Sequence, residues 1–402
     1  MSESVLADVL RPGDRVVVGQ ATSEPVGLVQ DLFAAAAQID DLTAFCGFSL
    51  NPAWKGAVPD ALGITTYCGL GSIGALTRRG RAKVIPFAMS QLSSALAART
   101  LPADVVLLQV SPADADGYHS LGFAADYVWE AAHVARVVVA EVNARVPITR
   151  SPCRLHRSQI VIARVSNTPL PEAPPEPPGE VQTRVAREVA KLVPDGATLQ
   201  IGIGKLSDAV AHALQDRRGL KIRSGMVGDW FPALVDAGAI DTASPDACLA
   251  SLAVGSGALY DWLGRSDRLG FALPEQLVAL IPGSPFMAIN SGIEVDLRGQ
   301  VNAEFLGDRY VGASSGQTDY FRAARRSVGG LAILALPSAN ERSDESRIVR
   351  RIASGFVTSA QSDVDMIITE HGAADIRATD FDERSRRIAA IADPRQRGAL
   401  TS

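Results

Sequence analysis

The sequence predicts an α/β protein made of two similar open domains with mainly parallel sheets. Three observations predict this class: the length of the chain, a proline-rich break near its middle, and short apolar runs that alternate with amphipathic segments on both sides. At 402 residues the chain exceeds the size at which one hydrophobic core usually stops growing. Hydrophobic residues make up 47% and charged residues 21%, the balance of a folded globular protein and not of a disordered chain.

The break is the segment TPLPEAPPEPPGE (168–180), which carries six prolines and few apolar side chains. This composition is typical of a stiff extended linker and not of a packed element. We therefore expect an N-terminal domain at residues 1–170, a linker at 171–180 and a C-terminal domain at 181–402.

In the first domain, near-continuous apolar runs predict strands that are buried on both faces. These runs are DRVVVGQ (14–20), AKVIPFA (82–88), DVVLLQVSP (104–112), RVVVAEVN (136–143) and SQIVIARV (158–165). The segment EPVGLVQDLFAAAAQ after the first run predicts a covering helix.

The second domain repeats this pattern. Its predicted strands are GATLQIGIG (196–204), LKIRSG (220–225), PFMAINS (285–291), LAILALPS (331–338), ASGFVTS (353–359) and VDMIITEHG (364–372). Helices are predicted at VQTRVAREVAKLV and KLSDAVAHALQDR. Because VVVGQATSEPVGLVQDLF and LQIGIGKLSDAVAHAL both read as strand, glycine turn and helix, we expect two similar units facing each other across a cleft.

Charge and composition exclude several partners. The net charge of −5, without a long basic run, argues against nucleic acid. The N-terminus lacks the pattern of a signal peptide, and no stretch reaches the roughly 18 apolar residues that span a bilayer, so we expect a cytoplasmic protein with no membrane partner. The cysteines and histidines are too scattered for a metal site, and we expect the cysteines to be reduced and buried: Cys46, Cys68, Cys153 and Cys248.

The stretch IGIGKLSD (201–208) is a candidate anion-binding turn. Gly202 and Gly204 fall between a predicted strand and a predicted helix, where free backbone N–H groups favour phosphate or carboxylate. A dinucleotide fingerprint would need a third glycine where Ser207 stands, so a close-packed structural turn is an equally good interpretation.

A second candidate is the stretch VGASSGQTDYFRAARRSVGG (311–330). Small residues such as Ser315 and Gly316 let the backbone approach a ligand closely, and Gln317 could aim a side-chain or backbone donor at it. The alternative is a flexible loop before a helix whose cationic face is solvated: Arg322, Arg325 and Arg326.

A third candidate lies at the end of the run RVVVAEVN. Glu141 and Asn143 are polar groups placed where a strand delivers side chains to a cleft. They either make buried hydrogen bonds or contact a ligand, and the sequence leaves both readings open.

Taken in order, these stretches resemble the acetyl-CoA hydrolase/transferase family of class I CoA-transferases, which includes 4-hydroxybutyrate and butyrate CoA-transferases. The resemblance runs nearly end to end and is carried by VSPADADGYHSLG, AEVNARVP, DGATLQIGIGKLSDAV, INSGIEVDLRGQVNAE, SSGQTDYFRAARRSVGG and FVTSAQSDVDMIITEHGAADIR. It implies the CoA-transferase fold, an acyl-CoA substrate held between two α/β domains, no permanently bound cofactor besides this coenzyme A, and a homodimer.

The resemblance also implies covalent chemistry, which this sequence departs from. In such enzymes a glutamate attacks the thioester and carries CoA to a second carboxylate, while the glycine-rich loop holds the oxyanion. Laid on the family motif, LKIRSGMVGDW (220–230) places Gly225 at the nucleophile and Asp229 at the family's own aspartate. Trp230 replaces a family glycine, which indicates either a remodelled acyl pocket or a core tryptophan. Glycine has no side chain to acylate, so the usual relay cannot run through Gly225.

The rest of the family frame looks intact. Residues where family-like groups are expected are Asn290, Glu294, Asp296, Gln300, Glu304 and Glu370.

Three functions follow as alternatives: an acyl-CoA enzyme that hydrolyses a thioester or a C–C bond of a β-oxo or cyclic acyl-CoA, a CoA-transferase that uses another carboxylate such as Asp229, and a non-catalytic acyl-CoA binder. In the first case water is the nucleophile, and its base is one of four residues: Glu24, Glu141, Glu304 or Glu370.

Overall fold

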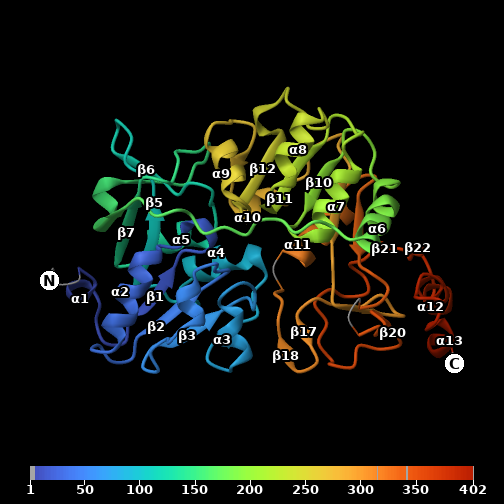
Figure 1. Ribbon diagram of the computed structural model, residues 1–402, viewed down its shortest axis with the longest axis horizontal. Helices are drawn as coiled ribbons and strands as arrows, with labels where there is room; N and C mark the ends of the chain where they lie inside the picture. Colours follow the sequence, from blue (N-terminus) through green and yellow to red (C-terminus); the bar gives the residue numbers. More distant parts are fainter. Residues whose placement is uncertain (1–4, 315, 341–342, 402) are drawn as a thin grey trace. The chain divides into compact units, whose positions relative to one another are not determined.

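The computed structural model describes residues 5–314, 316–340 and 343–401, and the chain divides into two compact units (Figure 1). Unit 1 consists of Met1–Ala173 and Ala250–Gln276, and unit 2 of Pro174–Leu249 and Leu277–Ser402. The first division lies inside the expected linker, where residues 167–179 form neither helix nor strand. Residues 250–276, which we expected in the C-terminal domain, group with unit 1.

Unit 1 is built on a seven-stranded sheet in the order β4-β3-β2-β1-β5-β7-β9. Neighbouring strands in it run parallel. The strands are β1 (Arg15–Val18), β2 (Thr43–Cys46), β3 (Gly63–Thr66), β4 (Lys83–Val84), β5 (Val105–Val110), β7 (Val137–Asn143) and β9 (Val161–Ser166). A separate antiparallel pair joins β6 (Tyr118–Ser120) to β8 (Arg154–His156).

Most of the helices of unit 1 lie between these strands along the chain, as the alternating pattern predicted. They are α1 (Val5–Val9), α2 (Val26–Ala36), α3 (Gly74–Arg78), α4 (Met89–Ala97), α5 (Tyr127–Val134) and α9 (Gly257–Gly264), with short 3-10 turns η1 (Ala21–Ser23), η2 (Pro52–Lys55) and η3 (Arg157–Gln159). The strand β13 (Gly270–Phe271) also belongs to unit 1. Two elements run across a boundary between the units: β12 (Cys248–Ala253) and α10 (Pro274–Leu277).

The central strands of unit 1 are buried as expected, and the two edge strands are not. The run AKVIPFA forms only the short edge strand β4, in which Lys83 is exposed and Val84 half-buried. Every residue of β5 is buried, because the strand has neighbours on both sides and is covered on both faces. β9 lies at the sheet edge, and three of its apolar side chains are exposed, with Val165 at 78%. The prediction that AKVIPFA and SQIVIARV are buried on both faces was therefore wrong, although each run does contain a strand.

Unit 2 contains strands in the order β11-β10-β14-β19-β21-β22, all parallel except the antiparallel pair β21-β22. They are β10 (Thr198–Ile201), β11 (Lys221–Val227), β14 (Phe286–Asn290), β19 (Leu331–Ala335), β21 (Met366–Thr369) and β22 (Gly372–Asp375). Smaller ladders join β15 (Glu294–Asp296), β16 (Val301–Asn302) and β20 (Ile348–Val349), and β17 (Phe305–Leu306) with β18 (Arg309–Tyr310).

The helices of unit 2 are α6 (Glu180–Ala190), α7 (Lys205–Ala213), α8 (Trp230–Asp236), α11 (Gln317–Arg326), α12 (Phe381–Ala390) and α13 (Arg397–Thr401), with one 3-10 turn η4 (Pro245–Ala247). Buried residues at helical spacing form one stripe along α6: Gln182, Val185, Ala186 and Val189. α6 packs beside α7, and α11 packs on β14 and β19.

Two further expectations met different outcomes. All four cysteines are free and buried, as predicted. The segment ASGFVTS (353–359) is not a strand, because the chain turns there with Gly355 at φ 75°, a conformation that glycine adopts without strain. In the described part of the chain, no helix has the length and apolar character needed to cross a membrane.

Candidate functional site

The sheet of unit 2 has a topological switch point between β10 and β14. The chain passes from β10 to β11 on one side, then returns to β14 on the other side of β10. Ligands of open parallel sheets bind outside the carboxyl ends of the strands at such a point. Two side chains mark it here, because Gln200 and Asn290 exchange amide hydrogen bonds of 3.2 and 2.7 Å across these strands.

The turn after β10 carries the predicted glycines. Gly204 has φ 103°, which favours glycine, and α7 begins at the next residue. Trp230, at the start of α8, is buried and donates from Nε1 to the carbonyl oxygen of Gly202 at 3.1 Å. Trp230 therefore braces the turn, so the interpretation as a packed tryptophan has direct support.

Gly225 is a buried residue near the carboxyl end of β11. The hydroxyl of the preceding Ser224 donates to the carbonyl oxygen of Ile201 at 2.5 Å, with the carbonyl oxygen of Met226 2.9 Å away, and this bond ties the strand end to β10. At residue 225 itself the strand offers backbone only.

Asp229 lies beyond the end of β11, at the N-cap position of α8. The charge of Asp229 acts on the carboxyl group of Asp208, which lies in the first turn of α7. Asp208 was not among the predicted site residues. Burial and the nearby Asp229 carboxylate raise the pKa of Asp208 from 3.8 to about 6. Its position one helical turn after Gly204 is the feature of the sequence that could have identified it.

The glycine-rich stretch is held against β16 and the residues that follow it. Gly312 packs on the backbone of Ala303 and Glu304 so closely that a Cβ atom there would collide. The Ser314 hydroxyl donates to Glu304 Oε2 at 2.9 Å, and Glu304 is 9% exposed. These contacts place a nearly buried carboxylate next to the loop, while Ser315 lies outside the described residues.

Gln317 begins α11 directly after Gly316. Its side chain donates to the carbonyl oxygen of Ser291 at 2.8 Å and accepts from the Ser359 hydroxyl at 2.9 Å. The amide therefore joins the start of α11 to the end of β14. The backbone N–H groups of the first helical turn remain the donors that can face a ligand.

Glu370 follows β21 and points to the end of β19. It accepts hydrogen bonds from the Ser338 backbone N–H at 2.9 Å and hydroxyl at 2.7 Å, and His371 Nε2 lies 3.6 Å from the same carboxylate. The residues Gly202, Asn290, Ser338 and Glu370 thus mark the carboxyl ends of four parallel strands of unit 2. Ser338 was not predicted, although it ends the run LAILALPS.

In unit 1, Glu24 follows η1 and is fully buried. It accepts from Trp54 Nε1 at 2.7 Å. Burial raises the pKa of Glu24 from 4.5 to about 7. The nearby polar side chains of Ser49 and Asn51 make this rise smaller than burial alone would. Even so, Glu24 Oε2 has no well-formed hydrogen bond. Glu24 is therefore a carboxyl group that changes charge near neutral pH.

Glu141 and Asn143 have structural partners instead. Glu141 Oε2 accepts from the backbone N–H groups of Gly27 at 2.9 Å and Leu28 at 3.3 Å, so it caps the N-terminus of α2. Asn143 Nδ2 donates to Gln109 and to the Thr168 carbonyl oxygen. These bonds support the buried hydrogen-bonding interpretation of both residues.

The donor set of the site is one of carboxylates, amides and hydroxyls. Across the described ranges, no three His, Cys, Asp or Glu side chains are grouped as a metal site would require. The arrangement in unit 2 combines a helix N-terminus, a glycine-rich turn and a nearly buried glutamate. Such groups can stabilise an oxyanion and move a proton.

Comparison with known proteins places the chain in a protein family. The acetyl-CoA hydrolase/transferase N-terminal domain matches residues 1–153, and the C-terminal domain of the same family matches residues 255–402. The 4-hydroxybutyrate coenzyme A transferase of Clostridium kluyveri is 34% identical over 80% of this chain and 77% of its own length.

Two further likenesses agree. The succinyl-CoA:acetate/propanoyl-CoA:succinate CoA transferase of Fasciola hepatica is 31% identical over 80% of this chain and 70% of its own length. The crystal structure of RipA from Yersinia pestis superposes with a TM-score of 0.89 at 28% identity, covering 98% of this chain and 94% of RipA. The chain belongs to the acetyl-CoA hydrolase/transferase family of enzymes.

Proposed function

We propose that this protein processes acyl-CoA thioesters without a covalent glutamyl relay, and that it hydrolyses the thioester or opens a C–C bond of a β-oxo or cyclic acyl-CoA. The observation that carries the proposal is Gly225, which offers no side chain where the resemblance places the nucleophile. The family supplies the substrate class, because it contains acetyl-CoA hydrolases and CoA transferases. Hydrolysis is the simplest reaction that these residues support.

Glu304 is the base that we propose for the attacking water. Its carboxylate lies beside Ser314, in the loop that leads into α11, and is shielded from bulk solvent. Glu370 is the less favourable base, because Ser338 already donates two hydrogen bonds to its carboxylate.

The first turn of α11 supplies the oxyanion support in this proposal. The backbone N–H groups at the start of a helix have no intrahelical partner, and the helix dipole favours negative charge there. Gln317 holds this turn against Ser291 through its side chain. A preorganised pair of donors at such a position stabilises a tetrahedral intermediate.

Hydrolysis in this proposal begins with attack by water. The water oxygen bonds to the thioester carbonyl carbon while its proton passes to Glu304, and the carbonyl oxygen becomes the oxyanion. The C–S bond breaks as the oxyanion collapses. Glu304 returns the proton to the departing thiolate, which leaves as free coenzyme A beside a carboxylic acid.

Product analysis in ¹⁸O water tests the proposal. The wild-type protein is incubated with simple, β-oxo and cyclic acyl-CoAs, each with and without acetate. We expect ¹⁸O in the acid product and rates that do not change when acetate is omitted. A strict need for acetate, with unlabelled acid as the product, would refute water as the nucleophile.

A gain-of-function variant tests the role of Gly225 separately. Gly225→Glu restores a carboxylate at this position, and we expect acetate-dependent formation of acetyl-CoA together with a glutamyl-CoA adduct visible by mass spectrometry. Gly225→Gln has nearly the same shape without a nucleophile and should form no adduct. If folded Gly225→Glu behaves like Gly225→Gln, the nucleophile position has been assigned wrongly.

CoA transfer is the second candidate, because the relatives above that share 31–34% identity are named CoA transferases. Asp229 would then be the nucleophile, although its side chain is one methylene shorter than that of glutamate and it is the N-cap residue of α8. This alternative requires ping-pong kinetics and a CoA adduct on Asp229 that disappears in Asp229→Asn. Binding without turnover of any acyl-CoA would instead indicate a non-catalytic binder.

A further inference from the structure

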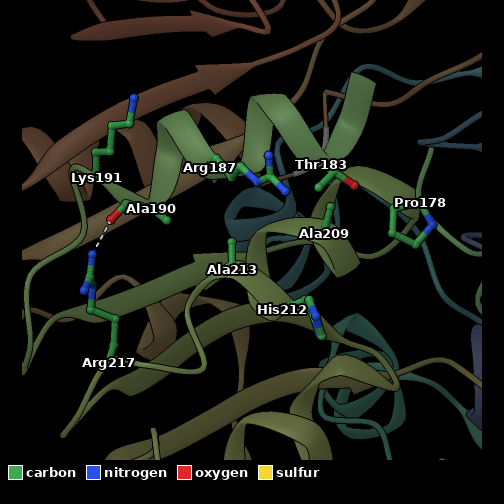
Figure 2. Close-up of a pocket in the computed structure, with 9 residues that line it drawn as sticks. All are labelled: Pro178, Thr183, Arg187, Ala190, Lys191, Ala209, His212, Ala213 and Arg217. Carbon is green, nitrogen blue, oxygen red and sulfur yellow. Dashed lines mark hydrogen bonds between the residues drawn. The ribbon is translucent and has the colours of Figure 1, made fainter. Parts of the chain in front are cut away.

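A hollow of about 400 Å³ lies between α6 and α7 on unit 2 (Figure 2). It is lined by residues of both helices and of the segments next to them: Pro178, Thr183, Arg187, Ala190, Lys191, Ala209, His212, Ala213 and Arg217. None of these residues belongs to the candidate site described above. The hollow therefore calls for an explanation of its own.

Small side chains create the space. Ala190 on α6 and Ala209 and Ala213 on α7 line the hollow where the two helices lie side by side (Figure 2). A larger apolar residue at these positions would fill the space between the helices. The alanine methyl groups give the hollow an apolar floor.

The rim of the hollow is cationic, and part of this charge is uncompensated. Within the part of the chain that the structure describes, the side chains of Arg187 and His212 have no hydrogen-bond or ion-pair partner. Lys191 pairs with Glu188 at 2.6 Å, and Arg217 donates to the carbonyl oxygens of Val193 and Ala190. Figure 2 shows Arg187 extending from α6 along the hollow and His212 standing on α7.

A second hollow, of about 460 Å³ beside α11, provides a contrast. Two of its arginines are matched by acids, because Arg322 lies 3.2 Å from Asp363 and Arg325 lies 2.7 Å from Asp365. An anion entering that hollow would compete with existing ion pairs. In the hollow between α6 and α7, Arg187 is available to a ligand without such competition.

We propose that the α6–α7 hollow is a binding site for a small organic anion that joins an apolar body to a carboxylate or phosphate group. The planar guanidinium of Arg187 can bind either oxyanion with two hydrogen bonds. The His212 imidazole can donate a hydrogen bond in its neutral and charged forms. The alanine floor receives the apolar body, and the volume lies within the range of small-molecule sites.

This inference goes beyond the proposed function and does not depend on it. α7 begins directly after Gly204 in the candidate site and also lines the hollow. A ligand held between α6 and α7 would therefore contact a helix that the candidate site uses, at a distance from the reacting groups.

Isothermal titration calorimetry of the full chain tests the proposal with three probes: octanoate, AMP and inorganic phosphate. We expect saturable binding of octanoate, of AMP or of both, and the preferred probe identifies the carboxylate or phosphate source. Inorganic phosphate should bind more weakly because it lacks an apolar body. Arg187→Ala should weaken binding by about tenfold or more, the effect of losing a charge-assisted hydrogen bond.

The matched control is Arg184→Ala, which removes an exposed arginine from the same helix outside the hollow. It should bind the probes like the wild type. Ala213→Leu fills the hollow without changing charge and should weaken binding at least as much, provided that circular dichroism shows a folded protein. The proposal fails if no probe binds saturably, if Arg187→Ala binds the probes as tightly as the wild type does, or if phosphate alone binds as tightly as the amphipathic anions.

Discussion

At the scale of single residues, Glu24 shows how burial alone changes the behaviour of a side chain. The carboxyl group lies out of reach of solvent, and its one strong partner is the Trp54 indole. Burial disfavours the charged form, so the pKa of Glu24 rises to about 7. An ordinary-looking glutamate in the sequence is therefore a group that titrates near neutral pH.

We predict a stability profile from this shift. The folded protein keeps the Glu24 proton up to about pH 7, whereas the unfolded chain loses it near pH 4.5. The resulting contribution to the free energy of unfolding is fully present below pH 4.5 and is lost as the pH rises through 7. Glu24→Gln should remove this decline, which amounts to about 3 kcal/mol at most.

Urea unfolding of both proteins between pH 4.5 and pH 8 measures the difference. Asp60→Asn is the control, because it removes a carboxylate from a fully exposed side chain of unit 1 and should leave the pH dependence unchanged. Parallel profiles for the wild type and Glu24→Gln would show that Glu24 is not protonated in the folded state at neutral pH.

At the scale of elements, Glu141 illustrates a polar residue that the sequence could not assign. It stands in a buried strand and looked equally suited to a ligand and to a structural bond. In the structure its carboxylate accepts hydrogen bonds from backbone N–H groups at the N-terminus of α2, a helix more than one hundred residues earlier in the chain. No local pattern reports such a pairing, because it depends on which helix end the fold brings to that strand.

We therefore expect Glu141→Ala to affect stability and not the chemical step. The substitution leaves the N–H groups of Gly27 and Leu28 without their acceptor, at a cost of about 1–3 kcal/mol. Thermal unfolding should show a lower Tm, while kcat measured well below that temperature should stay near the wild-type value. A loss of kcat in a variant of unchanged Tm would restore Glu141 as a candidate base.

The glycine-rich loop yields a prediction at the same scale. Gly312→Ala introduces a Cβ atom that meets the carbonyl oxygen of Ala303, so the loop must move away from β16. This movement should separate Ser314 from Glu304. Because a small displacement of a positioned catalytic group slows a reaction strongly, we expect kcat/KM toward any acyl-CoA to fall by about tenfold or more. Steady-state kinetics measure this effect.

Gly398→Ala is the control, because a Cβ atom there meets no neighbour. It should leave kcat/KM unchanged. Wild-type kinetics for Gly312→Ala would mean that the contact between the loop and Glu304 does not matter for the reaction.

The elements themselves were largely predictable, and the failures have physical reasons. Long amphipathic segments such as 181–193 and 205–217 became helices because each had an apolar stripe to bury. α6 packs on β19 and β21, and α7 packs on α6 and α8. The run SQIVIARV formed a strand but at the sheet edge, a placement that the composition of the run does not encode. The run ASGFVTS failed because Gly355 turns the chain where the apolar residues alone indicated a strand.

At the scale of the whole molecule, the candidate site was predictable where neighbours in sequence are also neighbours in space. The Gly202–Gly204 turn and the loop before Gln317 were found from their glycines. The Gln200–Asn290 pair and the Ser338–Glu370 pair were not, because each joins the ends of strands that are adjacent only in the folded sheet. Pairings of this kind need the strand order, which no single segment contains.

The sequence did not predict that residues 250–276, which follow the proline-rich linker, belong to unit 1. Within unit 1, Ala125 N–H donates to the Ser251 carbonyl oxygen at 2.7 Å, and Phe123 stacks on Tyr260 with ring centroids 5.4 Å apart. Phe271 N–H likewise donates to the Arg150 carbonyl oxygen at 2.8 Å. Unit 1 therefore draws part of its core and hydrogen bonding from chain that lies far beyond the proline-rich linker.

This connectivity predicts how the molecule responds to cutting. A fragment of residues 1–173 lacks the segment that covers Phe123, and it should expose apolar surface and bind ANS when expressed alone. A protease site inserted at Pro174–Pro178 should behave differently: after cleavage the two pieces stay together on gel filtration, because residues 250–276 of the second piece remain packed in unit 1. Uncut protein with the same insertion is the control for the insertion itself. If fragment 1–173 folds cooperatively on its own, or the nicked pieces separate without denaturant, residues 250–276 are not an integral part of unit 1.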